Sequence, residues 1–253
     1  MAVEQHLEQG VLTLQLHRPD KKNALTRAMY STLASALDAA QDNPEVRVIL
    51  LTGGSQCFTS GNDLQDFLQG GALAEDSPVF HFMRALFDCG KPVVAAVAGP
   101  AVGIGTTLLL HCDLVYVSAD AYLQMPFVTL GLCPEYGSSL ILPRLLGMQR
   151  ANALLLLGEA FSGDQAAVWG LANAALADGP QTLAHARQQA LRLAEQPAQA
   201  LALSRQLLRA EQREALRARI HEEGRLFAER LQSAEARTAL LAFLQRRKQA
   251  VSC

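Results

Sequence analysis

Apolar side chains follow strand-like patterns at five places in the first half of the chain. Residues Val11–Leu16 alternate between apolar and polar side chains, which predicts a half-buried strand. Residues Val46–Leu51 and Pro92–Ala98 are almost continuously apolar, which predicts strands that are buried on both faces. Shorter runs at Leu114–Val117 and Ala121–Met125 predict two further strands.

Helical patterns lie between these strands. Met29, Leu33 and Leu37 recur on one helix face, and Val79–Asp88 predicts a second helix. Strands that are buried on both faces and alternate with helices are typical of an α/β fold with parallel strands. Because the short strands come in pairs, we expect repeated ββα units rather than a plain doubly wound sheet.

The pattern becomes mainly helical after about residue 136. We predict helices over 136–146 and 149–157, and a last strand within 171–176. The sequence Ser162-Gly-Asp-Gln165 fits a capping box that opens another helix. From Pro180 onward the chain is rich in Ala, Leu, Arg, Gln and Glu, with Pro197 and Gly224 as breaks and Ser233 as a cap. We therefore divide the chain into a core, residues 1–178, and a helical region, residues 179–253.

Composition narrows the class of protein. The chain has 253 residues, of which 50% are hydrophobic and 18% charged, so it can bury a substantial core. A net charge of −2 with 6% aromatic residues argues against a nucleic-acid partner. The five cysteines form no C-x-x-C pair, which favours a reducing compartment without disulfides or a zinc site. We see no signal peptide and no apolar run long enough to span a bilayer, so we expect a cytoplasmic protein with no membrane partner.

Three segments could carry chemistry. Phe58–Asp63 and Gly99–Gly105 are glycine-containing loops between a strand and a helix, where unpaired backbone N–H groups could together hold an oxyanion. Glu135 precedes an apolar helix and could act as a base. The simpler interpretation is that both loops are ordinary turns and that Glu135 is a favourable acidic residue at a helix start. The adjacent residues His111-Cys112-Asp113 cannot converge on one metal ion, so no metal site is predicted.

Five motifs in order resemble the enoyl-CoA hydratase/isomerase (crotonase) superfamily over nearly the whole chain. They are Leu16–Leu25 (LHRPDKKNAL), Val48–Gly53 (VILLTG) with Phe58–Leu64 (FTSGNDL), Lys91–Gly103 (KPVVAAVAGPAVG), Cys112–Tyr116 (CDLVY) and Phe161–Leu171 (FSGDQAAVWGL). The resemblance implies a crotonase-like spiral of ββα units, an all-helical C-terminal trimerisation region and acyl-CoA thioester substrates. It also implies a homotrimer or hexamer, and no cofactor beyond the coenzyme A of the substrate.

The resemblance also implies roles for individual residues. The backbone N–H groups of Asn62 and Ile104 correspond to those of the family's oxyanion hole. Residues expected near the substrate or its coenzyme A are Lys22, Asn23, Ala24, Ser60, Gly61, Asp63, Leu64, Gly103 and Phe127. For Lys22 a solvated turn lysine is an equally good interpretation. Asp63 is also expected to cap the helix that follows it, and Asp113 to point away from the thioester.

Within the superfamily, the chain looks most similar to the peroxisomal-type Δ3,Δ2-enoyl-CoA isomerases. The two glutamates of the hydratases correspond to Thr107 and Phe127, which cannot act as bases, whereas the single glutamate of the isomerases corresponds to Glu135. This implies an isomerase that moves the double bond of a 3-enoyl-CoA to position 2. The alternatives are other acyl-CoA chemistry, such as hydration, hydrolysis, dehalogenation or decarboxylation, and an inactive acyl-CoA-binding member.

Overall fold

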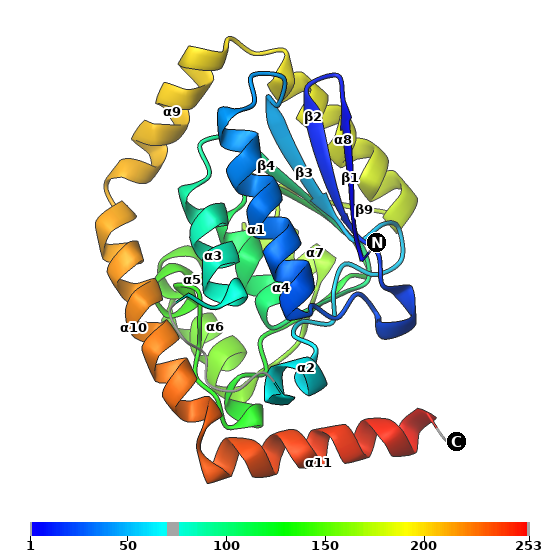
Figure 1. The fold of residues 1–253 in the computed structure, drawn as a ribbon, viewed down its shortest axis with the longest axis vertical. Helices are drawn as coiled ribbons and strands as arrows, with labels where there is room; N and C mark the ends of the chain where they lie inside the picture. Colours follow the sequence, from blue (N-terminus) through cyan, green and yellow to red (C-terminus); the bar gives the residue numbers. More distant parts are fainter. Residues whose placement is uncertain (1, 70–75, 252–253) are drawn as a thin grey trace.

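A six-stranded sheet forms the centre of the fold in the computed structural model, which describes residues 2–69 and 76–251 (Figure 1). In spatial order its strands are β1 (Val3–Glu8), β2 (Val11–Leu16), β3 (Val48–Thr52), β4 (Val93–Val97), β6 (Leu114–Ser118) and β9 (Ala174–Leu176). β1 and β2 form an antiparallel hairpin, and every later neighbouring pair is parallel. The loops that follow β3 and β4 therefore leave the same edge of the sheet, where α/β proteins commonly place their sites.

Helices cover both faces of this sheet. The helices up to residue 194 are α1 (Arg27–Asp42), α2 (Leu64–Gln69), α3 (Pro78–Asp88), α4 (Ile104–Thr107), α5 (Ser138–Leu146), α6 (Met148–Asn152), α7 (Gly163–Val168) and α8 (Gly179–Ala194). α8 begins the predicted helical region but packs against the sheet. Short 3₁₀-helices lie at Pro19–Lys21, Leu108–His111 and Val128–Leu130, and a π-helical turn lies at Ala153–Leu157. Ile49 and Leu51 of β3 join the core cluster that includes α1 and α3, and Val48 and Leu50 join the cluster that includes α8. The continuous apolar pattern of β3 thus reflects burial on both faces, as predicted.

A second sheet extends the main one. It consists of β5 (Pro100–Val102), β7 (Tyr122–Gln124) and β8 (Phe161–Ser162), with β5 and β7 parallel and β7 and β8 antiparallel. β4 and β6 of the main sheet each continue almost directly into β5 and β7 of this second sheet. The predicted α/β architecture with paired short strands is therefore confirmed.

The last three helices form an arm around the core (Figure 1). They are α9 (Ala198–Ala210), α10 (Arg213–Leu231) and α11 (Ala234–Val251). Arg205 and Arg209 of α9 bind the carboxylate of Asp113 at 2.7 and 2.8 Å, so Asp113 anchors the arm. The hydroxyl of Ser233 accepts a hydrogen bond from Ala236 N at 3.1 Å, which confirms the predicted cap. The final residues of the predicted helical region, 252–253, lie outside the described residues.

Two sequence-based predictions for the helices are wrong. Gly224 does not interrupt the arm but lies inside α10. The helix expected from residue 136 begins at Ser138, because Tyr136 and Gly137 have positive φ angles of 56° and 77° and cannot belong to a right-handed helix. Glu135 therefore lies in a loop before the helix rather than in its first turn.

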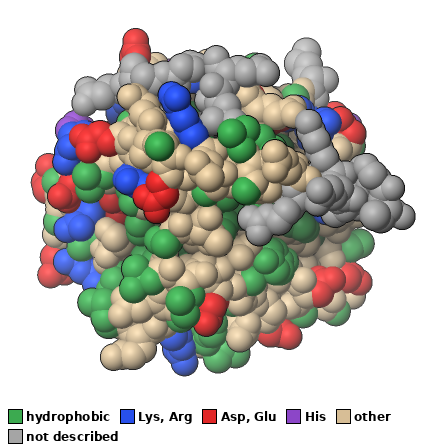
Figure 2. All heavy atoms as spheres, turned by 90° about the horizontal axis from the view of Figure 1, so that it is seen from below, with side chains coloured by type: hydrophobic (Ala, Val, Ile, Leu, Met, Phe, Trp, Pro, Cys, Tyr) green, Lys and Arg blue, Asp and Glu red, His purple; other side chains and the backbone are tan. Residues whose placement is uncertain are grey.

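Neither the core helices nor the arm could cross a membrane, since no helix within the described residues is both long and apolar enough. On the face seen from below in Figure 2, hydrophobic side chains lie between charged ones. Elsewhere, exposed leucines gather on α9, where Leu203, Leu207 and Leu208 are 60, 76 and 88% exposed.

Candidate active site

Three loops that are far apart in the sequence meet at one small cavity. Asn62 comes from the loop before α2, Ile104 is the first residue of α4, and Glu135 lies in the loop before α5. The cavity has a volume of about 20 Å³, enough for about one water molecule. Its other walls are apolar or small side chains of α3 and α10: Val79, Phe80, Met83, Gly224 and Phe227. The three residues predicted to act together therefore do share one space.

The loop that carries Asn62 is fixed by backbone hydrogen bonds on both sides of this residue. Leu25 N donates to Gly61 O at 2.8 Å, and Asp63 N donates to Leu25 O at 2.8 Å. The N–H of Asn62 itself has no acceptor among the described residues. Gly61, with φ +85°, is required here because a Cβ atom would lie 2.6 Å from Val102 O. The loop thus presents one free N–H at a defined place.

The second N–H comes from the start of α4. Gly103 precedes the helix with φ 59° and ψ −120°, a conformation that favours glycine. The N–H groups of Thr106 and Thr107 donate to Gly103 O, whereas Ile104, at the first helical position, has no acceptor for its N–H among the described residues. Such an orphan donor at a helix start attracts negative charge.

Glu135 is a buried carboxyl group whose side chain accepts from a single hydrogen-bond donor among the described residues. Its side chain is 7% exposed, and its Oε1 accepts a hydrogen bond from the hydroxyl of Thr107. Burial raises the pKa of Glu135 to about 8; the Thr107 hydrogen bond lowers it and the charge of Glu223 raises it further. Burial therefore outweighs the neighbouring donor, and the carboxyl group can both accept and release a proton near neutral pH.

The turn that contains Glu135 has a strained backbone, which hydrogen bonds and ring stacking hold in place. Tyr136, which follows it, has φ +56°, a costly conformation for a bulky residue. Its hydroxyl donates to Met83 O at 2.7 Å, and its carbonyl lies 2.7 Å from Nε2 of His111, whose ring stacks on the tyrosine at 3.7 Å. Burial lowers the pKa of His111 to about 4, so the imidazole is neutral at pH 7.

Glu223, a residue that sequence reasoning missed, ties the arm to this turn. It lies on α10, is 5% exposed, and accepts hydrogen bonds from Gly137 N at 2.5 Å and Ser139 N at 3.0 Å. It therefore caps α5 from another helix. Burial raises the pKa of Glu223, while its bonds to Ser139 and Gly137 act in the opposite direction. Nothing in the Arg- and Glu-rich pattern of 213–231 distinguishes this glutamate from its neighbours.

Comparison with known proteins identifies the class of this site. The family model described as enoyl-CoA hydratase/isomerase matches residues 6–251. The chain belongs to the enoyl-CoA hydratase/isomerase family. It is 36% identical to 1,2-epoxyphenylacetyl-CoA isomerase of Escherichia coli over 96% of this chain and 95% of that protein. It is 34% identical to human enoyl-CoA delta isomerase 2 over 95% of this chain and 62% of that protein. Other relatives are named as hydratases.

The solved structures confirm the crotonase-like fold. The structure of Pseudomonas aeruginosa OdaA has a TM-score of 0.94 and 59% sequence identity, and the match covers 96% of this chain and 98% of that one. Sequence and fold together thus show an enzyme of the enoyl-CoA hydratase/isomerase family, while the names of the relatives leave the reaction divided between hydration and isomerisation.

Five of the residues predicted to lie near coenzyme A form one patch beside Asn62: Lys22, Asn23, Ala24, Ser60 and Gly61. Ser60 N donates to Lys22 O at 2.9 Å, and the Thr59 hydroxyl donates to Asn23 O at 2.7 Å, so the segment that includes Ala24 lies against the Ser60–Asn62 loop. The side-chain nitrogen of Asn23 donates to three backbone carbonyls and is buried. The contacts of this patch with coenzyme A stay predictions.

Asp63 and Leu64 lie at the start of α2. Oδ1 of Asp63 accepts from Gln65 N at 3.1 Å and Asp66 N at 3.3 Å, which confirms the predicted cap. Its Oδ2 binds Arg18 at 2.8 Å. Both carboxylate oxygens of Asp63 are therefore occupied in the cap and the ion pair, which argues against a role as a catalytic base.

Gly103 and Phe127 lie behind the cavity rather than in its wall. A Cβ atom at Gly103 would be 4.0 Å from the Phe127 ring, and that ring packs edge-on against Phe227 at 6.3 Å. Phe227 lines the cavity, and Phe127 supports it from outside. The described residues contain no group of three or more His, Cys, Asp or Glu side chains placed to hold a metal ion.

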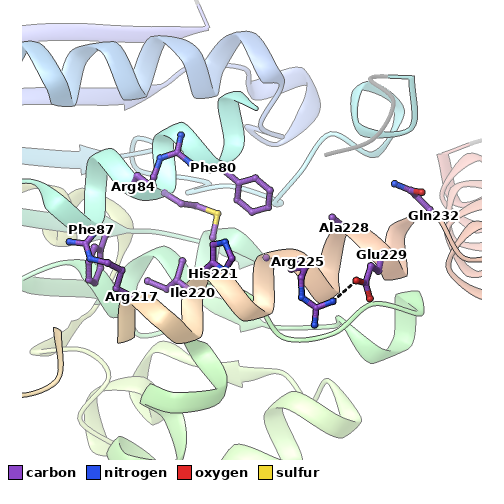
Figure 3. A pocket seen from close by; sticks show the side chains of 12 residues that line it. Phe80, Arg84, Phe87, Arg217, Ile220, His221, Arg225, Ala228, Glu229 and Gln232 are labelled. Atoms are coloured by element: carbon purple, nitrogen blue, oxygen red, sulfur yellow. Dashed lines mark hydrogen bonds and ion pairs between the residues drawn. The ribbon is translucent and has the colours of Figure 1, made fainter. Parts of the chain in front are cut away.

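A larger pocket of about 510 Å³ adjoins the cavity between α3 and α10. Figure 3 shows Phe80 and Arg84 of α3 across from Ile220, His221 and Arg225 of α10. The two spaces share Phe80, Met83 and Gly224. A Cβ atom at Gly224 would lie 2.8 Å from Cε1 of Phe80, so this glycine makes room for the aromatic ring inside α10. Phe80, Met83 and Gly224 thus form the boundary between the two spaces.

Proposed function

We propose that this family member is a Δ3,Δ2-enoyl-CoA isomerase, which converts a 3-enoyl-CoA into the trans-2-enoyl-CoA. The observation that carries the proposal is that Glu135 is the only carboxyl group among the described residues that line the small cavity. The same cavity is lined by Asn62 and Ile104, whose backbone N–H groups have no acceptor among the described residues. A 1,3-proton shift needs one base that can also act as an acid, whereas hydration is served better by a second acid–base group to hold and activate water.

The reaction follows from the chemistry of the thioester. The C2 proton of a 3-enoyl-CoA is acidic because it lies between a carbonyl group and a double bond. Glu135 removes it, and the N–H groups of Asn62 and Ile104 stabilise the negative charge that develops on the thioester oxygen of the dienolate. The same carboxylic acid returns the proton to C4, which leaves the double bond between C2 and C3 and restores the carboxylate. The proton balance closes with no redox cofactor.

Two relatives support an isomerase rather than a hydratase. The names of human enoyl-CoA delta isomerase 2 and of 1,2-epoxyphenylacetyl-CoA isomerase both describe isomerisation of an acyl-CoA. The test is direct: incubate the purified protein with 3-hexenoyl-CoA and follow the absorbance of the conjugated 2-enoyl thioester. We expect turnover. Its absence, with acyl-CoA binding retained, would leave hydration, hydrolysis, dehalogenation, decarboxylation or an inactive binding protein as the function.

We propose that the acyl group of the substrate extends from the cavity past Phe80 and Gly224 into the larger pocket. We predict that Gly224→Ala lowers kcat/KM for 3-decenoyl-CoA about tenfold, because the new methyl group would lie 2.8 Å from Cε1 of Phe80 and force that ring to shift at the boundary of the two spaces. The same variant should handle 3-hexenoyl-CoA much more nearly like the wild type. Equal losses on both substrates would show that the acyl chain does not follow this route.

We also propose a homotrimer, or two trimers paired as a hexamer. The support is the row of exposed leucines on α9, since such an apolar surface commonly marks an interface. Light scattering at micromolar concentration should give at least three times the chain mass of 27.3 kDa. A monomer mass would contradict the assembly, and Leu207→Glu should lower the mass if α9 forms the contact.

A further inference from the structure

One turn of helix connects the two halves of the proposed active site. Ile104 and Thr107 are the first and last residues of α4, and residues three apart lie on the same side of a helix. Ile104, whose N–H has no acceptor among the described residues, lines the cavity, and the Thr107 hydroxyl donates to Oε1 of Glu135. Thr107 is fully buried. A hydroxyl group has one proton to donate, so this bond commits it to the carboxylate.

The neighbouring threonine shows that this arrangement is specific. Thr106 is equally buried, but its hydroxyl lies 2.5 Å from Ala101 O and 3.2 Å from Gln124 O, both backbone carbonyls. The Thr106 hydroxyl thus contacts β5 and β7, whereas the Thr107 hydroxyl donates to the carboxylate of Glu135. The other carboxylate oxygen, Oε2 of Glu135, accepts no hydrogen bond from the described residues. It is also absent from the set of completely buried polar atoms that have no hydrogen-bond partner. It is the oxygen left to face the cavity.

We propose that Thr107 is a positioning residue, whose hydroxyl holds Oε1 of Glu135 so that Oε2 carries the proton between C2 and C4 of the substrate. This inference rests on the proposed function of Glu135 as the base. The carboxylate must take a proton from C2 and return it to C4, so its orientation must be fixed. A hydrogen bond that holds one carboxylate oxygen fixes that orientation.

The surroundings make this hydroxyl the main group that favours the ionised form of Glu135. Glu223 of α10 adds negative charge, and the remaining titratable neighbours are Tyr30 of α1, Cys133 and Tyr136, each of whose pKa values is raised by burial above its usual range. All of them are neutral or negative at pH 7. Removing the Thr107 hydroxyl should therefore raise the pKa of Glu135 above its value of about 8.

The test compares Thr107→Val, Thr107→Ser and the matched control Thr106→Val, with kcat/KM for 3-hexenoyl-CoA measured as a function of pH. The wild-type profile should rise with pH around a midpoint near 8. In Thr107→Val we expect that midpoint to move about one to two pH units upward, with a loss of roughly 10- to 100-fold at pH 7 that shrinks at higher pH. Thr107→Ser should restore the wild-type midpoint, and Thr106→Val should leave it unchanged whatever it does to stability.

A second measurement separates this inference from the proposed function. The carboxyl ¹³C resonance of Glu135, assigned by its absence in Glu135→Gln, reports the same pKa without turnover. A Glu135→Gln enzyme that keeps its isomerase activity would overturn the proposed role of Glu135 as the base, on which this inference rests. A Thr107→Val protein whose Glu135 titrates at the wild-type pH would overturn the positioning role alone. Should the valine variant fail to fold, Thr107→Ala removes the same hydroxyl without added bulk and gives the same two outcomes.

Discussion

Replacing Glu135 with glutamine should reduce isomerase kcat by about 10²- to 10⁴-fold. Glutamine keeps the size of the side chain and can still contact the Thr107 hydroxyl, but it cannot take the C2 proton or return it to C4. The loss could exceed that range, because one group performs both proton transfers. The measurement is kcat on 3-hexenoyl-CoA, with protein integrity followed by thermal unfolding.

Binding of acyl-CoA should survive this substitution. The N–H groups of Asn62 and Ile104 belong to the backbone of other segments, and no hydrogen bond among the described residues joins Lys22 or Ser60 to Glu135. A loss confined to kcat with an unchanged Kd is the signature of a group that acts on the transition state. A kcat within a few-fold of wild type would show that another residue is the base.

Glu223→Gln is the matched control for a nearby buried carboxyl group. It removes a negative charge that raises the pKa of Glu135, so the midpoint of the pH profile should move downward rather than upward. It should also weaken the cap on α5, since the side-chain amide cannot accept from both Gly137 and Ser139 as the carboxylate does. The contrast separates the general loss of a buried carboxylate from the loss of the base.

The sequence predicts the parts of this fold whose patterns are local. β3 and β4 could be recognised because both of their faces are buried, and α1 because its apolar residues recur at helical spacing. β1 was not predicted, because Val3 is its one buried side chain and the other five are exposed. A strand at the edge of a sheet without a buried face leaves no pattern to recognise.

The candidate site was predictable only as separate pieces. The loops around Asn62 and Ile104 and the glutamate at 135 could be named from motifs, but their meeting depends on how β3, β4 and α5 are arranged in space. The sequence marks Thr107 only as a position where the hydratases have a glutamate. Its hydrogen bond to the carboxyl group of Glu135, 28 residues later, depends on the fold. Because glycine disfavours helix, the sequence predicts a helix break at Gly224. In the fold, packing against Phe80 requires a glycine at this position inside α10.

Hydration of crotonyl-CoA should be nearly absent, at least about 10³-fold slower than isomerisation of 3-hexenoyl-CoA. Addition of water needs one group to orient and deprotonate the water and a second to protonate the α-carbon. Thr107, at one of the two positions that the hydratases fill with glutamate, is neutral and already bonded to Glu135. Phe127, at the other, lies outside the cavity behind Phe227.

The measurement follows the loss of the 2-enoyl absorbance with crotonyl-CoA under the conditions of the isomerase assay. Glu135→Gln, prepared in parallel, serves as the control for hydratase carried over from the expression host, because such a contaminant would act equally in both preparations. Any excess in the wild type is then due to Glu135 alone. If that excess came within tenfold of the isomerase rate, a single carboxyl group would be sufficient to hold and activate water here. The distinction between isomerase and hydratase drawn from Thr107 would then fail, while Glu135 would remain the base of the site.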